Sequence, residues 1–460
     1  MSTPTDHAGA RPAGMRRIAV AAGFGNFMEW FDFAVYGFFA TTIGHVFFPS
    51  HSATSELLSA LAVFGIAFFM RPLGGVILGN IGDRVGRRAA LATSVLLMGV
   101  STTLVAALPT YESVGLLAPI LLVLLRCLQG LSAGGEWAGS SSFLVEYAPR
   151  ERRGLWGSVV TATAAIGSLA GAVVAIALTT WLTQGQMEAW GWRIPFLLAA
   201  PLALAGLYVR LKLEDTPVYR ELQRERRVAR APLREALKTN RKPIVLIFFC
   251  AAVEGLGYYY LATYVINFLT SDRVGMETTQ ALAATAGGLA IYAALCPFAG
   301  LLSDRIGRKP SMVLGSAGLA LFAIPAFLIM NSGSVLAVIL AISGFAVFEA
   351  MVNVTTVVLL VELFPARTRM SGGSIGFNIA LAAIGGPGPL IAAAFASSIA
   401  FAGAGAFYMV AVALVSLVAL ARFLPETRGI DLGVGEETSA APVRTERFTR
   451  KPVREPVSGA

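Results

Sequence analysis

Twelve apolar stretches follow one another along this chain and determine what it can fold into. A helix needs about 20 apolar residues to cross the roughly 30 Å of hydrocarbon in a bilayer. Only 14% of the residues are charged and 56% are hydrophobic, whereas soluble domains are about 25% charged. The sequence therefore predicts an all-α integral membrane protein with twelve transmembrane helices. The predicted spans begin near Ile18, Leu57, Ala89, Val114, Leu155, Trp192, Pro243, Thr278, Ser311, Ser334, Met370 and Gly403.

Two short charged signatures each occur twice. Asp83-Arg84-Val85-Gly86-Arg87 returns 221 residues later as Asp304-Arg305-Ile306-Gly307-Arg308. Glu146-x-x-Pro149-x-x-x-Arg153 returns 216 residues later as Glu362-x-x-Pro365-x-x-x-Arg369. Nearly equal offsets indicate two copies of one unit of about 220 residues. With six spans in each copy, the halves are expected to be parallel repeats around a central cavity, where the function should lie.

The charges predict the orientation of the chain. Of the 36 Lys and Arg residues, the loops on one side of the predicted membrane carry only Arg193 and Arg273. This is the positive-inside pattern, so both termini are expected on the cytoplasmic side of the membrane. The expected location is the plasma membrane, that is, a bacterial inner membrane. The net charge of +9 then reflects topology and no nucleic-acid partner. The predicted regions are a cytoplasmic tail (1–17), a six-helix bundle (18–213), a cytoplasmic linker with surface helices (214–242), a second bundle (243–427) and a disordered tail (428–460).

The duplicated signatures lie on the same predicted side of the membrane. An acid in a tight glycine-containing loop can cap a helix N-terminus, and the cations beside it can pair with nearby acids. We interpret the four segments as a conformational latch, with a simple topology signal as the alternative. The predicted latch residues are Asp83, Arg84, Arg87, Glu146, Arg153, Asp304, Arg305, Arg308, Glu362 and Arg369.

Five charged side chains fall inside predicted spans of the first half, where a charge costs a few kcal/mol and needs a partner or a function. Glu29 and Asp32 are three residues apart and so share one helix face. We expect one of them to face Arg126, and we expect Arg71 to form an intramembrane ion pair with Glu136. Asp32, or failing that Glu29, is the predicted proton carrier.

The predicted substrate site contains a cation and polar side chains. Arg126 stays charged and can bind a carboxylate in two-pronged fashion, and Gln129 lies one turn further along. Tyr259 and Asn267 belong to a polar, tyrosine-rich stretch of the seventh span that could line the cavity. Two acids in the second half have no obvious cationic partner and are alternative proton carriers: Glu254 and Glu349.

Several motifs resemble those of a known family. The Gly79-x-x-x-Asp83-Arg84-x-Gly86-Arg87-Arg88 loop, its second copy and Arg126-x-x-Gln129-Gly130 resemble signatures of the major facilitator superfamily. Gly25-Asn26-Phe27-Met28-Glu29-Trp30-Phe31-Asp32-Phe33 and Trp190-Gly191-Trp192-Arg193-Ile194-Pro195-Phe196 resemble its metabolite:proton symporter family, and proline/betaine carriers most closely. The resemblance implies uptake driven by a proton gradient. The tail lacks the coiled coil of osmosensing carriers, which puts osmotic regulation in doubt.

These observations predict proton-coupled secondary active uptake of a small polar metabolite, either a zwitterion such as proline or betaine or an organic acid. Proton-driven efflux and a non-transporting membrane sensor are the alternatives. We expect no enzymatic activity, cofactor or bound metal. The expected partners are the solute, protons and the lipid bilayer, and the chain is expected to act as a monomer.

Overall fold

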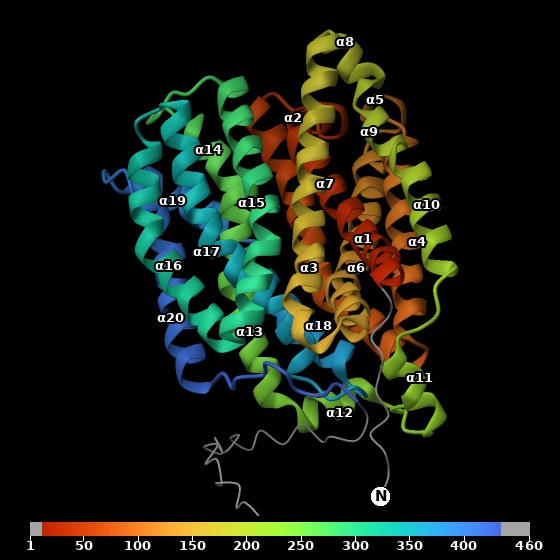
Figure 1. Cartoon of the computed structure of the whole chain (residues 1–460). Helices are drawn as coiled ribbons and strands as arrows, with labels where there is room; N and C mark the ends of the chain where they lie inside the picture. The colour runs from red at the N-terminus through yellow and green to blue at the C-terminus, as the bar shows by residue number, and fades with distance from the viewer. Residues whose placement is uncertain (1–11, 434–460) are drawn as a thin grey trace, which may run out of the picture.

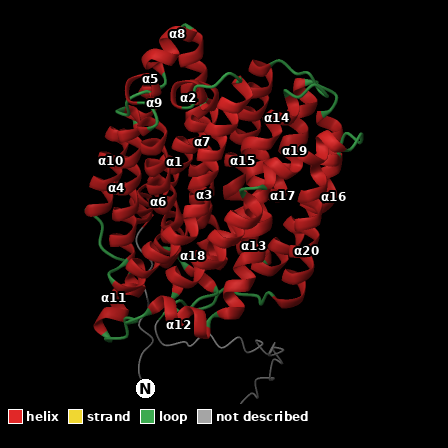
Figure 2. Ribbon diagram, turned by 180° about the vertical axis from the view of Figure 1, so that it is seen from behind, coloured by secondary structure: helices red, strands yellow, loops and turns green. Residues whose placement is uncertain are grey.

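The structure is a computed structural model that describes residues 12–433. All regular elements in this range are helices (Figure 2). They form two bundles side by side (Figure 1). The helices that build the spans of the first bundle are α1 (Pro12–Phe38), α3 (Ala53–Arg84), α4 (Arg87–Ala106), α6 (Leu117–Tyr147), α7 (Arg153–Trp181) and, within one span, the short α9 (Arg193–Leu197) and α10 (Ala199–Leu211). Those of the second are α13 (Arg241–Tyr259), α15 (Thr278–Ile306), α16 (Arg308–Met330), α17 (Val335–Glu362), α18 (Arg369–Ala380), α19 (Gly388–Ser398) and α20 (Phe407–Phe423).

The predicted all-α membrane fold is confirmed. Eleven helices in the described range are long and apolar enough to cross a membrane. The twelfth is α1, which has 27 residues but contains Asn26, Glu29 and Asp32, and these polar residues lower its mean hydropathy. This helix begins at Pro12, before the predicted Ile18. The remainder of the predicted N-terminal tail, and the predicted disordered tail from residue 434, lie outside the described residues.

Two spans of the second bundle are not continuous α-helices. The seventh passes from α13 through a π-helical turn (Tyr260–Tyr264) into α14 (Val265–Leu269). The eleventh passes from α18 through another π-helical turn (Leu381–Gly385) and a Gly-Pro step into α19. Proline removes a backbone donor and bends a helix. Irregular backbone at membrane depth is tolerated only where protein or a cavity surrounds it.

Short elements distinguish the two ends of the bundles. The linker forms α11 (Pro217–Arg224) and α12 (Pro232–Thr239), which lie at the bottom of Figure 1, and we call this the linker end. The opposite end carries α2 (Ala40–Phe47), α5 (Tyr111–Val114) and α8 (Gln184–Gln186). The linker is more than a solvated tether, because α11 buries Val218, Tyr219 and Leu222.

The two bundles meet along two pairs of helices. In one pair α3 packs on α18, and in the other α7 packs on α15. At the second contact the backbones nearly touch, since a Cβ built on Gly300 would lie 2.4 Å from the Gly154 carbonyl oxygen. Small residues permit this approach, which in lipid takes the place of the hydrophobic drive between helices.

Candidate functional site

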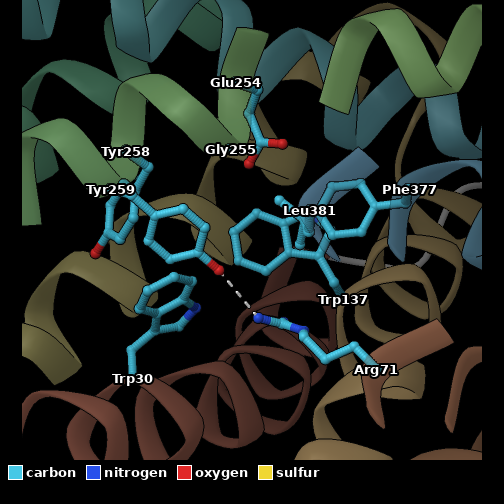
Figure 3. Close-up of a pocket in the computed structure, with 9 residues that line it drawn as sticks. All are labelled: Trp30, Arg71, Trp137, Glu254, Gly255, Tyr258, Tyr259, Phe377 and Leu381. Carbon is cyan, nitrogen blue, oxygen red and sulfur yellow. Dashed lines mark hydrogen bonds between the residues drawn. The ribbon is translucent and has the colours of Figure 1, made fainter. Parts of the chain in front are cut away.

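A small cavity lies between the bundles. Its free volume is about 10 Å³, and its wall combines charged and aromatic side chains from both halves (Figure 3). Because it lies where the two repeats meet, it occupies the position at which repeat-built membrane proteins hold their ligands. The lining residues are Trp30, Arg71 and Trp137 of the first bundle and Glu254, Gly255, Tyr258, Tyr259, Phe377 and Leu381 of the second.

Arg71 on α3 is the cation of this cavity. Its Nη2 lies 2.5 Å from Oε1 of Glu29, and its Nη1 donates to the Tyr259 hydroxyl at 3.3 Å (Figure 3). Arg71 and Glu29 are both buried, yet Arg71 Nε and Glu29 Oε2 have no hydrogen-bond partner. The pair therefore joins the two bundles through Tyr259 and retains unused hydrogen-bonding capacity.

Arg126 and Asp32 form a second buried pair. Arg126 Nη1 lies 2.8 Å from Asp32 Oδ2, and Gln129 Nε2 donates to Asp32 Oδ1 at 2.8 Å. The guanidinium carbon of Arg126 also lies 3.9 Å from the centre of the Tyr36 ring. The expected contact between Arg126 and an acid of α1 is confirmed. Arg126 and Gln129 do not line the cavity among the described residues, so solute contact by either side chain stays a prediction.

One aromatic ring connects the two ion pairs. The guanidinium carbons of Arg71 and Arg126 each lie 5.7 Å from the centre of the Phe33 ring. Such contacts add about 0.5–2 kcal/mol of cation–π attraction each. The Arg71–Glu29 pair is therefore separated from the Arg126–Asp32 pair by a single side chain, that of Phe33.

The predicted ion pair between Arg71 and Glu136 is wrong. Glu136 instead pairs with Arg210 of α10, which contacts both of its oxygens, and it also accepts from the Ser94 hydroxyl. Glu136 lies ten residues beyond Arg126 on α6, about 15 Å along the axis. Its neighbour Trp137 lines the cavity, so Glu136 lies near the depth of the cavity, but its side chain is on the face of α6 that packs against α4 and α10. Arg210, near the end of its span, resembled an ordinary flanking cation in the sequence.

Of the two polar candidates in the seventh span, one lines the cavity and one does not. Tyr259 lies in the wall, as expected. Asn267 is exposed on α14 and is not among the lining residues, so solute contact by Asn267 stays a prediction. Eight residues separate the two side chains, about 12 Å along a helix, which carries Asn267 past the cavity toward the opposite end.

At the linker end, the first duplicated signature joins the two halves. Asp83 accepts the backbone N–H groups of Met370 at 3.2 Å and Ser371 at 2.8 Å, so it caps the first turn of α18 in the other bundle. Arg369 Nη1 lies 2.7 Å from Glu146 Oε1. Capping and ion pairing by these residues thus hold α18 against the first bundle.

The second copy makes the reciprocal contacts. Asp304 accepts the backbone N–H groups of Gly154 at 2.8 Å and Leu155 at 2.9 Å, and so caps the first turn of α7. Arg153 lies 3.3 Å from Glu362. Each half therefore caps a helix of the other half, which closes the linker end.

Only some of the predicted latch arginines take part. The arginine four residues after each aspartate pairs with it, at 3.2 Å for Arg87 and 2.8 Å for Arg308. Arg84 and Arg305 have exposed side chains, and the contacts they make in the network use their carbonyl oxygens. Including these two side chains in the latch was wrong, because residues next to an inward-facing aspartate face outward.

A third duplicated element supports the first loop, and the sequence analysis missed it. Asp215 accepts the N–H groups of Arg87 at 3.1 Å and Arg88 at 3.3 Å, and burial raises the pKa of its carboxyl group. The neighbouring Thr216 hydroxyl donates to Glu146. The acid caps α4 and the threonine binds the latch glutamate.

The equivalent element of the second half follows α20. Glu426 accepts the N–H groups of Arg308 at 2.9 Å and Lys309 at 3.1 Å, and the Thr427 hydroxyl donates to Glu362 at 2.6 Å. The signal that could have identified both elements is an acid–threonine pair that follows the last span of each half, 211 residues apart.

Glycine is required in both loops. Gly86 has φ +127° and Gly307 has φ +104°, a region that L side chains rarely adopt. A Cβ would also lie 2.0 Å from Asp215 at the first position and 2.4 Å from Glu426 at the second. The same backbone strain and the same capping carboxylate therefore occur in both repeats.

The chain belongs to the Major Facilitator Superfamily, which it matches over residues 22–387 and again over 247–456. It is thus a multi-pass membrane transporter and not an enzyme. It is 37% identical to the glycine betaine/proline/ectoine/pipecolic acid transporter OusA of Dickeya dadantii, over 90% of this chain and 84% of that one. It is 36% identical to the proline/betaine transporter of Escherichia coli K12, over 88% and 82%. The resemblance to proline/betaine carriers is confirmed.

Solved structures with the same fold include the proton:xylose symporter XylE. The structure of XylE bound to 6-bromo-6-deoxy-D-glucose matches with a TM-score of 0.77 at 18% identity, over 91% of this chain and 98% of that one. The inward open conformation of XylE from E. coli matches with a TM-score of 0.65 at 18% identity, over the same shares of both chains. The twelve-helix fold is confirmed by these matches.

Replacing Asp83 by Asn is expected to slow transport about fivefold while leaving solute affinity near normal. Asn keeps one acceptor oxygen but turns an NH2 donor toward the second backbone N–H group and loses the charge that pairs with Arg87. Loss of one hydrogen bond costs about 1 kcal/mol, which shifts a two-state equilibrium by about fivefold. The change would act on the closed linker end and not on the cavity. Transport rates and solute affinity in proteoliposomes measure it, with Asp304→Asn expected to have a weaker effect and exposed Asp272→Asn as the matched control. A wild-type rate in Asp83→Asn would leave the loop as a topology signal only.

Proposed function

We propose that the protein takes up a zwitterionic solute of the proline or betaine class together with protons, by alternating access. The observation that carries this proposal is a cavity between the repeats that sets a single arginine opposite aromatic rings and an acid. The names of the relatives support the solute class. Both termini are assigned to the cytoplasm on the positive-inside pattern, which makes the closed linker end cytoplasmic.

Arg71 is the proposed partner of the solute carboxylate. A guanidinium keeps its charge at any working pH and binds a carboxylate in a planar, two-pronged geometry. Arg71 faces the cavity and has an unpaired Nε. The Tyr259 hydroxyl beside it could bind the same carboxylate. These features favour Arg71 over the predicted Arg126 for this role.

The aromatic wall is the proposed partner of the solute cation. The Trp30 and Tyr258 rings are 4.6 Å apart and nearly perpendicular, and Trp137 stacks on Phe377 at 5.7 Å. Ring faces attract a quaternary or secondary ammonium, which binds there without donating several hydrogen bonds. Glu254 adds a negative charge or a hydrogen-bond acceptor on the same side (Figure 3). In this conformation the cavity has about 10 Å³ of free volume, which is room for about one water molecule, so it must widen to admit the solute.

Coupling is proposed to arise from competition for Arg71. In the described conformation Arg71 is held by Glu29. A solute carboxylate that takes this cation leaves Glu29 buried and unpaired, and such a charge is costly at membrane depth. Glu29 therefore binds a proton when the solute binds, so both move together. The geometry favours Glu29 over Asp32 as the carrier, because Asp32 and its partners lie away from the cavity.

Uptake into proteoliposomes under an imposed pH gradient tests the function. Radiolabelled glycine betaine should accumulate in vesicles whose interior is more alkaline, and an added protonophore should release it. Expulsion of preloaded betaine when the outside is more acidic would instead support efflux. No betaine or proline flux in either direction, with binding retained, would support a sensor and contradict the proposal.

A further inference from the structure

Two carboxyl groups of the second bundle are buried and form no ion pair among the described residues, although Arg71 faces one of them, Glu254, across the cavity. Glu349 on α17 is 0% exposed, and neither of its oxygens has a hydrogen-bond partner. Glu254 on α13 is 3% exposed, and its Oε2 is also unpaired. Neither forms an ion pair with any residue in the 12–433 range. An ionised carboxylate costs several kcal/mol in such a place, so Glu349 carries a proton in this conformation.

Glu349 contacts the helix that carries Glu254. Its carboxyl group packs on the α13 backbone at Gly257, where a Cβ would lie 2.0 Å from Glu349 Oε2. Glu254 is one turn earlier on α13 and interacts electrostatically with Glu349. Glu254 in turn faces the cavity (Figure 3). The two acids therefore connect the interior of the second bundle to the cavity.

None of the other titratable groups that surround Glu349 in the described part of the chain is a cation. They are Tyr258 on α13 and Tyr292 and Cys296 on α15, and Asn353 follows Glu349 by one turn on α17. The Tyr292 hydroxyl and Asn353 Oδ1 are buried and lack hydrogen-bond partners. These groups could hydrogen-bond a protonated or a hydrated carboxyl group, and none of them could neutralise an ionised one.

One tyrosine separates this cluster from the first bundle. The Tyr258 ring lies 5.7 Å from the Tyr292 ring, and its hydroxyl is 3.2 Å from the Ser168 hydroxyl of α7. Tyr258 also contacts Trp30 of α1. Rocking of one bundle against the other would break these contacts across the interface and admit water to the acids. A proton on Glu349 would then be free to leave.

We propose that Glu349 and Glu254 form a second proton-binding site, so that two protons accompany each solute molecule. This inference rests on the proposed proton-coupled uptake and adds to the proton on Glu29. A hydronium ion from the cavity protonates Glu254. A water molecule then relays the proton: the Glu254 O–H bond breaks as this water takes the proton, and the water gives another of its protons to form the O–H bond of Glu349. After the bundles rock, the proton returns to water on the other side.

The ratio of inside to outside solute concentration at equilibrium gives the number of protons that accompany each solute molecule. With the membrane potential clamped at zero, each coupled proton contributes about tenfold accumulation for each pH unit of gradient. At about one pH unit, the wild type should concentrate radiolabelled glycine betaine about 100-fold, whereas Glu349→Gln should reach only about tenfold. Glu254→Gln should also fall to about tenfold. Exposed Glu112→Gln is the matched control and should remain near 100-fold.

The outcomes separate this inference from the proposed function. A wild-type ratio near ten, or a ratio near 100 in Glu349→Gln, overturns the second proton site and leaves proton-coupled uptake intact. No accumulation by the wild type overturns the proposed function itself. Betaine exchange between preloaded vesicles and medium reports whether Glu349→Gln is folded. If that variant does not exchange, Glu254→Gln decides: a ratio near ten supports the site, and one near 100 overturns it.

Discussion

Replacing Glu29 by Gln is expected to abolish net solute uptake while leaving exchange between preloaded vesicles and medium. In the variant, a bound solute carboxylate still neutralises Arg71, so the loaded protein can reorient. The empty protein cannot, because Arg71 has lost the partner that lies 2.5 Å away in the wild type. An unpaired buried charge costs about 3–5 kcal/mol, which slows the empty return step at least about 100-fold.

Initial rates of net uptake and of counterflow exchange measure this effect in the same vesicles. The matched control is Glu112→Gln, since Glu112 is exposed on α5 and distant from both ion pairs. Asp32→Asn provides the comparison inside the membrane. Normal net uptake by Glu29→Gln together with loss of uptake by Asp32→Asn would move the coupling role to the Asp32–Arg126 pair.

The repeats and their linker-end network could be read from the sequence to a large extent. Membrane spans follow from length and hydropathy alone, and duplicated signatures at nearly equal offsets reveal parallel repeats. The loop sequences contain enough information to predict caps, because a glycine that a tight turn requires and a carboxylate occur together in both copies. Gly86 and Gly307 both have a positive φ, so the two repeats have the same loop conformation at this position.

The partners of the buried charges could not be predicted in the same way. Periodicity places Glu29, Asp32, Arg71 and Arg126 inside spans, but the depth and rotation of each helix decide which of them meet. Glu136 lies next to the cavity residue Trp137 along α6, but the rotation of this helix turns its side chain to Arg210. Helix packing sets that register, and in lipid it depends on close contacts of small residues across the whole bundle.

The aromatic residues that line the cavity also could not be predicted from the sequence. Tyr258 and Tyr259 stood out as part of a cluster, whereas Trp30, Trp137 and Phe377 come from three different helices. A single aromatic residue in an apolar span resembles ordinary packing. Only the association of the two bundles gathers these rings around one cavity.

Replacing Arg71 by Lys is expected to weaken glycine betaine binding by roughly 10- to 100-fold. Lysine keeps the charge that Glu29 needs, so the variant avoids an unpaired buried acid. It loses the planar fork, and a hydrogen bond between charged groups contributes about 1.5–3 kcal/mol. Choline shares the trimethylammonium group with betaine but has no carboxylate, so its weaker binding should be nearly unchanged. The variant should therefore lose its preference for betaine over choline.

Titration of intrinsic tryptophan fluorescence measures both affinities, because Trp30 and Trp137 line the cavity. Arg126→Lys is the matched control: it makes the same chemical change in the pair that lies behind Phe33, and its betaine affinity should change less than about threefold. The reverse result, with betaine binding weakened by Arg126→Lys and preserved in Arg71→Lys, would assign the carboxylate to Arg126. An equal loss of betaine and choline binding in Arg71→Lys would mean that Arg71 shapes the cavity and does not bind the carboxylate, because only a carboxylate contact distinguishes the two solutes.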